Sequence, residues 1–535
     1  MDDLISELPD DILSSILTML SIKDLLKTSV LSKRWCKLWG LRKDLYFDIH
    51  NVLGTEIELL QKGYLVDVTR YSRTDRCVNL DLTQNEFVKR VDQFLKNFHG
   101  TAIDSLLINF YLESEQSNTI DQWISFAIVR GVERINLLFL GRPYQHRTTQ
   151  NKHYKFDSAL FSETNASTIK HLRLEYCLVC HPTIRDFTPF KNLRSLSLRD
   201  TKLDELFIES LLSNCRHLEK LSLVFCVFKS SMPKIVSSSL CYLEVAMCYY
   251  LFGDIYQGDL NLDIVDCPKL TSLEYHGLDL DTLDLNTPLL KNIFFSISLK
   301  ELDAFLALCA TFPELEILQM GTYFKVKTSL KITQPLKHLK QLNLIIDNQY
   351  ILNNEEYDPL WILNILQASP LLQKLTITYT NSKFITNQKD IRDVEMFSHD
   401  KIKVIELGGC VGNWFEIELV MNILKYAHKL EQIVASPYWR EDELSDWNHD
   451  PVWFQSGRKR MSEKLQEAPS QRWGYIRIMS GTIIGGILGF YVMHRVEISY
   501  KEKMNERLRN YEAELKRRRE EKISEFEIEE SSSKF

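Results

Sequence analysis

The sequence predicts an α/β fold in which a small helical domain is followed by a long repeat solenoid. Two patterns support this prediction. Apolar residues recur at helical spacing over about the first forty residues, and a short apolar phrase then recurs many times between residues 103 and 435. The chain has 535 residues, more than one hydrophobic core usually organises. A stack of repeats accommodates this length, because each repeat needs to contact only its neighbours.

The N-terminal segment is predicted to form three short helices. Residues 9–11 are a helix-start signal, and they precede apolar residues at helical spacing, namely Ile12, Leu13, Ile16, Leu17 and Leu20. Ser21 is the predicted cap of a second helix, which carries Leu25, Leu26, Val30 and Leu31. The third has three apolar residues on one side, Trp35, Leu38 and Trp39. So small a unit has too little interior for these side chains, so part of its apolar surface must face a partner or the following domain.

These residues resemble the F-box of plant proteins. The matching strings occur in the order of the family pattern: Leu8-Pro9-Asp10, Ile12-Leu13, Lys23-Asp24, Thr28 to Trp35, and Leu38-Trp39. The resemblance implies an F-box over residues 1–48 that docks a Skp-type adaptor, and through it a cullin and a RING subunit. It also implies a set of adaptor-binding residues: Leu8, Pro9, Ile12, Leu13, Ile16, Leu25, Val30, Leu31, Trp35 and Trp39.

The repeated phrase places apolar residues at its positions one, four and six. The clear copies are Ile169/Leu172/Leu174, Leu193/Leu196/Leu198, Leu218/Leu221/Leu223, Leu240/Leu243/Val245, Leu270/Leu273/Tyr275, Leu290/Ile293/Phe295, Leu315/Leu318/Met320, Leu339/Leu342/Leu344, Leu372/Leu375/Ile377, Ile402/Ile405/Leu407 and Leu430/Ile433/Ala435. Weaker copies are Ile103/Leu106/Ile108 and Val132/Ile135/Leu137. Positions four and six alternate with polar residues as in a half-buried strand, and the clear copies start 20 to 33 residues apart, which leaves room for a returning helix or loop. These features predict an irregular leucine-rich-repeat solenoid over residues 100–398, with a generic mixed helix and strand domain as the alternative.

Residues 399–440 are predicted to be one more repeat that caps the stack, with a strand, a turn, an amphipathic helix and a strand. The features are Ile402 to Glu406, the turn at Gly408-Gly409 with Gly412, Glu416 to Leu419, and Leu430-Glu431 ahead of Ile433-Val434. This segment resembles the FBD region that often follows F-box and leucine-rich-repeat arrays in plants. A terminal repeat has to close the open end of the core, so no chemistry needs to be assigned to it.

The chain changes in composition after residue 440. Residues 441–474 are predicted to be a linker, because they pass from an acidic tract to a basic, polar stretch. Residues 475–494 are predicted to form one transmembrane helix, since 478–493 carry no charge and Gly481, Gly485 and Gly489 suit close packing in lipid. A buried core helix is the alternative.

Residues 495–535 are predicted to be a charged helical tail. Basic residues flank both ends of the apolar stretch, so the membrane orientation stays open. The tail is atypical of the resembled family, and we hypothesise a fusion with a neighbouring reading frame that begins at Met461.

Composition and motifs argue against nucleic-acid binding and against catalysis. Lys and Arg number 65 against 72 Asp and Glu, a formal net charge of −7, whereas duplex binding needs a cationic face. The 11 cysteines are irregularly spaced and the N-terminus is acidic, which favours reduced thiols in the cytoplasm and/or nucleus, or at a membrane if the apolar segment anchors the chain. Cys177 and Cys180 with His181 lack a second ligand pair, so neither a metal nor a cofactor is expected. Buried structural thiols are expected at Cys177, Cys226, Cys248 and Cys410.

The resemblance implies a non-catalytic substrate-recognition subunit of an SCF-type (Skp-cullin-F-box) ubiquitin ligase, whose repeats hold a target protein. One alternative is a membrane-tethered leucine-rich-repeat scaffold without a ligase role, which would contact the bilayer through residues 475–494. The other is a hydrolase within the irregular repeats, but the sequence lacks a nucleophile-elbow serine and a phosphate-cradling loop. The target, and the use of a small-molecule ligand, stay open because repeat surfaces recognise through variable side chains.

Overall fold

The computed structural model describes two compact units, within residues 1–372 and 373–535. The described residues are 9, 12–13, 16, 20–28, 39–62, 65–70, 73–139, 153–157, 160–162, 166–179, 188–203, 207–228, 234–252, 255–259, 262–276, 283–285, 287–297, 302–322, 332, 334–347, 360–384, 390, 392, 398–438 and 460–461.

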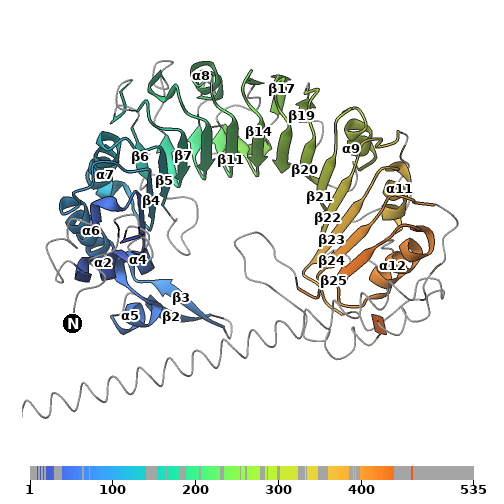
Figure 1. Ribbon diagram of the computed structural model, residues 1–535, viewed down its shortest axis with the longest axis horizontal. Helices are drawn as coiled ribbons and strands as arrows, with labels where there is room; N and C mark the ends of the chain where they lie inside the picture. Colours follow the sequence, from blue (N-terminus) through green and yellow to red (C-terminus); the bar gives the residue numbers. More distant parts are fainter. Residues whose placement is uncertain are drawn as a thin grey trace, which may run out of the picture. The chain divides into compact units, whose positions relative to one another are not determined.

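A long parallel sheet forms the first unit (Figure 1). Its strands follow one another in space in chain order: β1 (Asp44–Asp48), β4 (Ser105–Asn109), β5 (Arg134–Leu138), β7 (His171–Glu175), β9 (Ser195–Arg199), β11 (Lys220–Val224), β14 (Tyr242–Ala246), β18 (Ser272–His276), β20 (Asn292–Ile297), β21 (Ile317–Thr322) and β22 (Gln341–Asp347). Each pairs with the next in parallel, with no shift of register inside a pair. The predicted leucine-rich-repeat solenoid is confirmed.

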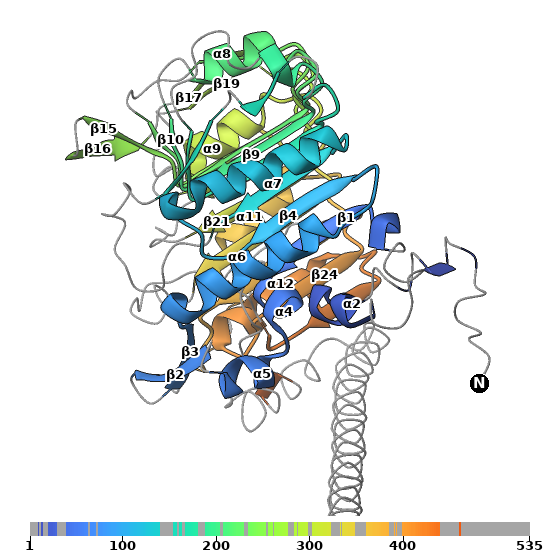
Figure 2. The same cartoon turned by 90° about the vertical axis from the view of Figure 1, so that its left-hand side faces the viewer.

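Helices return the chain between the strands of this sheet. They are α4 (Ile49–Leu53), α5 (Glu56–Gln61), α6 (Leu80–Lys96), α7 (Ser117–Val129), α8 (Phe207–Asn214) and α9 (Leu302–Cys309), with the 3-10 turns η2 (Ser114–Gln116) and η5 (Thr188–Phe190). The 3-10 turn η1 (Trp39–Leu41) precedes β1, and α11 (Trp361–Ala368) follows β22. Figure 2 shows α6 and α7 lying along one face of the sheet. That face contains the core, because Phe87, Val91 and Phe94 of α6 are fully buried there.

Short strands replace helices in the middle of the unit. One small sheet has β10 (Lys202–Leu203), β12 (Val227–Phe228), β15 (Tyr249–Phe252) and β16 (Ile255–Asp259), and another has β13 (Lys234–Val236), β17 (Leu262–Asp266) and β19 (Leu283–Leu285). The two-stranded pieces are the hairpin of β2 (Leu65–Arg70) with β3 (Arg73–Val78), and β6 (Tyr154–Phe156) with β8 (Cys177–Val179). These short spacers fit the irregular period of the sequence.

The apolar phrase forms the repeat core. Its positions four and six fall on the strands, where Leu221 and Leu223, for example, are fully buried. Position one lies just before each strand and is buried as well, as at Leu218 and Leu240. Because β-strand side chains alternate between faces, the polar residues between them lie on the opposite face of the sheet.

The phrase did not predict β1, because an arginine occupies its first position. Arg42 stands where the other repeats have an apolar residue, and only 5% of it is exposed. Its Nε donates to the carbonyl of Asp44 at 2.9 Å and its Nη1 to the carbonyl of Leu20 at 3.3 Å. The buried guanidinium is thus hydrogen-bonded to the first residue of β1 and to the N-terminal segment. Burial lowers its pKa.

Buried thiols follow several strands, as predicted. Cys177, Cys226, Cys248 and Cys410 are free and buried. Cys226 Sγ donates to the carbonyl of Leu198, and Cys248 Sγ to that of Leu223, one repeat earlier in each case. Burial raises the pKa of the Cys177 thiol. Cys226 and Cys248 are thus structural donors between repeats. Cys180 and His181 lie outside the described residues.

The second unit continues the pattern of strand, helix and strand. It has β23 (Lys374–Thr380), β24 (Val404–Gly408), α12 (Trp414–Tyr426) and β25 (Gln432–Ala435), and its strands are parallel and in register. The element order predicted for residues 399–440 is therefore confirmed, while its role as a cap stays a prediction. Phe415 of α12 packs edge-on against Tyr379 of β23, with ring centroids 5.7 Å apart.

A buried carboxylate starts α12. Asn413 and Glu416 form a capping box, in which Glu416 Oε2 accepts hydrogen bonds from the N–H groups of Val411, Gly412 and Asn413 at 3.0, 2.6 and 3.0 Å. Cys410 Sγ donates to the same oxygen at 3.1 Å. Burial nevertheless raises the pKa of Glu416 to about 7, although each of these donors lowers it.

We expect this carboxylate to make the second unit less stable as pH rises. A folded-state pKa of about 7, against an ordinary 4.5, means that folding favours the protonated form. The loss of stability should begin near pH 4.5 and be complete above about pH 7. Limited proteolysis of the 414–426 segment between these pH values measures it. Glu416→Gln should abolish the dependence, and an unchanged dependence in that variant would assign it to another group.

The predicted transmembrane helix at 475–494, the charged tail at 495–535 and most of the linker at 441–474 lie outside the described residues. Within the part of the chain that is described, no helix combines the length and the apolar character needed to cross a bilayer.

Candidate functional site

The candidate site is the surface formed by the N-terminal helical residues. Residues 12, 13 and 16 are helical, and the Leu13 N–H donates to the carbonyl of Pro9 at 3.0 Å. Ile12 is 44% exposed and Ile16 is 37% exposed, whereas Leu13 is fully buried. Residues four apart lie one above the other on a helix, so the two isoleucines share one face. The helix therefore buries one apolar side within the chain and presents another to its surroundings.

The predicted adaptor-binding residues divide into three groups. Pro9, Ile12 and Ile16 are exposed. Leu13, Leu25 and Trp39 are buried within the chain, with 0%, 0% and 2% exposure. The others, Leu8, Val30, Leu31 and Trp35, lie outside the described residues. The docking role of all ten stays a prediction, and the exposed group is the part that a partner reaches without rearrangement.

The second helix, α2 (Ile22–Thr28), begins at the predicted cap. Ser21 Oγ accepts a hydrogen bond from the Asp24 N–H at 3.0 Å and donates to the Asp24 carboxylate at 2.8 Å. Lys27 Nζ pairs with Asp24 at 2.8 Å, and this pairing is the main reason that the pKa of Asp24 is lowered. Both side chains are more than half exposed, so the pair contributes little stability.

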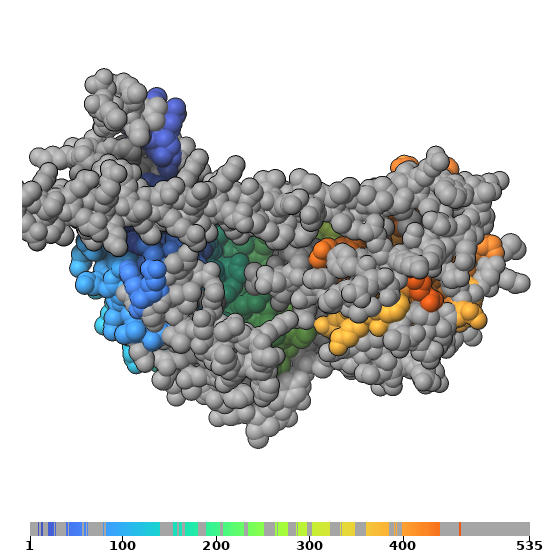
Figure 3. Space-filling view, turned by 90° about the horizontal axis from the view of Figure 1, so that it is seen from below, coloured from blue at the N-terminus to red at the C-terminus, as the bar shows by residue number. Residues whose placement is uncertain are grey.

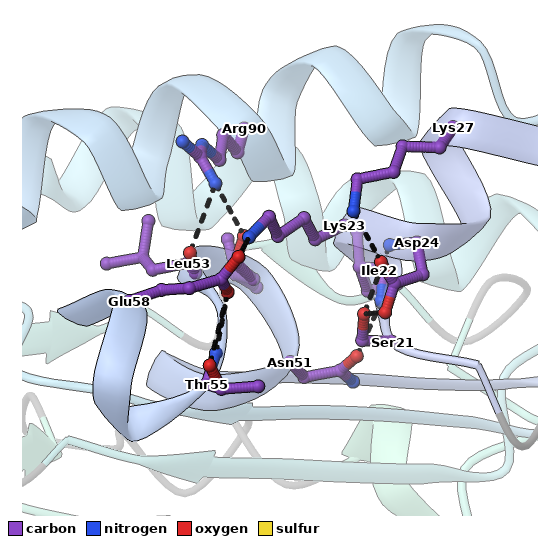
Figure 4. A network of polar contacts seen from close by, with 11 residues as sticks. Ser21, Ile22, Lys23, Asp24, Lys27, Asn51, Leu53, Thr55, Glu58 and Arg90 are labelled. Atoms are coloured by element: carbon purple, nitrogen blue, oxygen red, sulfur yellow. Dashed lines mark hydrogen bonds and ion pairs between the residues drawn. The ribbon is translucent and has the colours of Figure 1, made fainter. Parts of the chain in front are cut away.

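A polar network joins α2 to the first repeat (Figure 4). Asn51 of α4 accepts a hydrogen bond from the Ile22 N–H at 2.6 Å and donates to the carbonyl of Tyr46 on β1. Lys23 Nζ lies 2.5 Å from Glu58 of α5. This pairing is the largest cause of the lowered pKa of Glu58.

Further contacts extend this junction into the repeat helices. Arg90 of α6 donates to the carbonyl of Val52 at 3.1 Å and pairs with Glu86 at 2.7 Å. Trp39, just before β1, stacks on Phe94 of α6 with ring centroids 6.0 Å apart. The N-terminal helical residues and the sheet are thus joined by both hydrogen bonds and aromatic packing.

Asn51→Ala is expected to loosen this junction. The substitution leaves the Ile22 N–H without its acceptor, which should cost about 1–2 kcal/mol of the free energy of unfolding of α2. Hydrogen exchange at the α2 amides measures this cost. Asn97→Ala is the control, because Asn97 is exposed and its side chain donates only to the Gln93 carbonyl one turn earlier. Equal protection of α2 in both variants would show that Asn51 does not hold the junction.

Through its described residues, this site offers contact surfaces and positioning but no reactive group. Pro9, Ile12 and Ile16 are chemically inert side chains, and the polar groups of the junction are already paired with one another. Within the described ranges, no group of three or more metal-ligating side chains comes together. The arrangement is suited to binding another protein.

Comparison with known families gives two matches. A family model described as "At1g61320/AtMIF1, LRR domain" matches residues 94–468. The F-box domain model matches residues 5–45, which include the exposed isoleucines and α2.

Individual relatives come from Arabidopsis thaliana. The "Putative F-box/FBD/LRR-repeat protein At5g22610" is 26% identical over 285 residues, 52% of this chain and 49% of the relative. The "F-box/FBD/LRR-repeat protein At1g13570" is 26% identical over 449 residues, 81% of this chain and 91% of the relative. The "Putative F-box/FBD/LRR-repeat protein At3g49030" is 30% identical over 222 residues, 41% of each chain. This chain thus spans about half of the first relative, less of the third and nearly all of the second.

Proposed function

Because the chain belongs to the plant F-box/FBD/LRR-repeat protein family, we propose that it is the substrate-recognition subunit of an SCF-type ubiquitin ligase. Proteins of this family are generally non-catalytic adaptors. In this proposal the F-box binds a Skp-type adaptor, which links it to a cullin and a RING subunit, and the repeats bind a target protein.

The observation that carries the proposal is the apolar surface of the F-box match. Ile12 and Ile16 lie one turn apart with 44% and 37% exposure, although Leu13 between them is fully buried. Single exposed apolar side chains are common on proteins, but adjacent ones within a matched docking domain favour a partner surface. Burial of both isoleucines against an adaptor would supply the central contacts of that interface.

The buried members of the predicted docking set have a different part in the proposal. Leu13, Leu25 and Trp39 are buried within the chain, and Trp39 stacks on Phe94 of the first repeat's helix α6. In this proposal the buried residues fix the position of the helical segment, and the exposed Pro9, Ile12 and Ile16 contact the adaptor. Leu8, Val30, Leu31 and Trp35 complete the set as expected from the family pattern.

The proposed mechanism is proximity. A receptor that holds its target beside an activated ubiquitin raises the local concentration of the reacting groups, and the bond-forming residues belong to other subunits. The junction around Asn51 and Lys23 supports this mechanism, because it ties the F-box helix α2 to the sheet that would carry the target. A flexible connection between the F-box and the sheet would lower the effective concentration of the target near the activated ubiquitin.

Affinity purification of the full chain from plant cells with a proteasome inhibitor present tests the proposal. The expected result is co-purification of a Skp-type adaptor and a cullin, together with a ubiquitin-modified target. Recovery of the chain without any Skp-type protein, under conditions that retain other such complexes, would contradict the proposed function.

A further inference from the structure

A basic patch lies on the polar face of the first unit, on strands β5, β7 and β9. The core residues of these strands, such as Leu172 and Leu174, are buried, so the alternate residues lie on the other face. The register places Arg134 opposite His171, Asn136 opposite Arg173, and Arg173 opposite Ser197. Arg199 lies one row further, opposite Glu175. Three arginines from three successive repeats, Arg134, Arg173 and Arg199, therefore meet on one face, and we call them the arginine patch.

The arginine patch is open and only partly neutralised. The side chains of Arg134, Arg173 and Arg199 are 52%, 47% and 33% exposed. Figure 3, which views the molecule from below, shows atoms of the teal-to-green part of the chain at the surface. Lys220 of β11 adds a further exposed cation opposite Ser195.

Two carboxylates meet three guanidinium groups here. Arg173 donates from Nε and Nη2 to Glu175 Oε1 at 2.9 and 2.6 Å, and Arg199 Nε lies 3.9 Å from the same oxygen. Arg134 lies 3.6 Å from Asp44, which already accepts a hydrogen bond from Ser105. Among the described residues, the ion pairs of Arg134 and Arg199 are thus longer than hydrogen bonds. Guanidinium donors remain for a further oxyanion.

His171 lies on the middle strand, β7, between Arg134 and Ser195, and burial and nearby positive charge lower its pKa. Burial is the main cause of its lowered pKa, and Arg134 is the next cause. The hydroxyls of Ser195 and Ser197 and the amide of Asn136 lie among the cations at register positions on the same face. The face is therefore rich in hydrogen-bond donors as well as in positive charge.

We propose that the arginine patch is the part of the repeat surface that binds the target, and that it binds an acidic segment of that protein through glutamate or aspartate side chains. This inference rests on the proposed function. Arg134 and Arg199 are two strand spacings apart across the sheet, about 10 Å, and four residues apart along the strands, about 13 Å. The diagonal between them is therefore about 16 Å, which an extended segment covers in about five residues. Arg173 donates from two nitrogens to a single oxygen of Glu175, so its guanidinium already binds a carboxylate, the group that the target would present.

Carboxylates fit the charge of the patch better than phosphates do. The three arginines of the patch face two carboxylates, Asp44 and Glu175, so the excess of positive charge within the patch is one, with Lys220 on the neighbouring strand. A carboxylate carries a single charge, whereas a phosphoryl group carries nearly two and would leave part of its charge uncompensated. A long polyanion such as a nucleic acid would meet the overall charge of −7 beyond the patch.

Fluorescence anisotropy with short labelled peptides tests the proposal on the full chain. The peptides carry glutamate, glutamine, lysine or phosphoserine at the same positions. We expect binding of the glutamate peptide, weakened by salt, and about tenfold weaker binding of the glutamine and lysine peptides. Arg134→Gln with Arg173→Gln and Arg199→Gln should weaken glutamate-peptide binding by about tenfold or more.

The matched control removes the same charge elsewhere. Lys269→Gln with Lys340→Gln and Lys403→Gln neutralises three exposed lysines outside the arginine patch and should leave peptide binding unchanged. An equal loss in both variants would overturn the proposal, as would tighter binding of the phosphoserine peptide or of a single-stranded oligonucleotide. Adaptor binding, measured on the same samples, should be unaffected by the arginine substitutions. If the unsubstituted chain bound the glutamate peptide but no adaptor, the ligase role would be refuted, whereas the assignment of the arginine patch as a peptide-binding surface would not.

Discussion

Ile12→Asp combined with Ile16→Asp should abolish co-purification of a Skp-type adaptor. Both side chains are exposed on the F-box helix, and each charge would have to be desolvated in an apolar interface. A few buried apolar anchors usually carry most of the binding energy, so we expect the affinity to fall by about a hundredfold or more. A pull-down of the full chain with purified adaptor measures this change.

The control for this experiment introduces the same two aspartates at exposed apolar positions outside the F-box. Leu82→Asp with Val129→Asp alters two apolar residues of α6 and α7 that are 52% and 81% exposed. Both double variants should keep the repeats folded, because exposed substitutions away from special features change stability little. Equal loss of adaptor in the two variants, or retention in both, would remove Ile12 and Ile16 from the docking surface.

Gly409→Ala should give the largest loss of stability in the second unit. Gly409 has a φ of +63°, and a Cβ at this position would lie 1.9 Å from the carbonyl oxygen of Tyr379. Neither the backbone of β23 nor the buried Tyr379 side chain can move away cheaply. Strain and displacement together should cost about 3 kcal/mol or more, measured as loss of exchange protection at the α12 amides.

Gly131→Ala separates the two contributions to this cost. Gly131 has a similar φ of +72°, but the nearest atom to its added Cβ is a methyl of Thr168 at 3.9 Å. Only the backbone strain should remain, about 1 kcal/mol. The loss of exchange protection is measured near each substituted glycine. If Gly409→Ala causes no greater loss than Gly131→Ala, the close approach to Tyr379 carries no cost.

The strands of the solenoid were predictable because burial repeats with them. Leu221, Leu223 and their counterparts occupy the same positions in every copy of the phrase, and the fold buries all of them. β1 escaped prediction because Arg42 replaces the first apolar residue of its phrase. The chain buries that guanidinium by giving it two carbonyl acceptors, a compensation that no local pattern reveals.

The docking surface was predictable as a segment but not side chain by side chain. Ile12 and Leu13 are both apolar residues of one motif, yet one is 44% exposed and the other is fully buried. Which side of the helix is buried depends on tertiary contacts with distant parts of the chain, and local spacing does not encode these. Amphipathic spacing alone cannot separate an inward apolar side from an outward one.

The arginine patch was not visible in the sequence for a different reason. Arg134, Arg173 and Arg199 are separated by 39 and 26 residues along the chain, from 173 − 134 and 199 − 173. They also occupy different positions within their strands, so no periodic signal connects them. Only the strand register brings them to one face, diagonally across three repeats.

The central claim is that the exposed face of the F-box helix is covered by another subunit. The most direct measurement is hydrogen exchange at residues 9–16 of the full chain, with and without purified Skp-type adaptor, alongside size-exclusion chromatography. We predict an equimolar complex in which these amides become protected. A chain that elutes alone, with unchanged exchange at Ile12 and Ile16 at adaptor concentrations that saturate other F-box proteins, would contradict it.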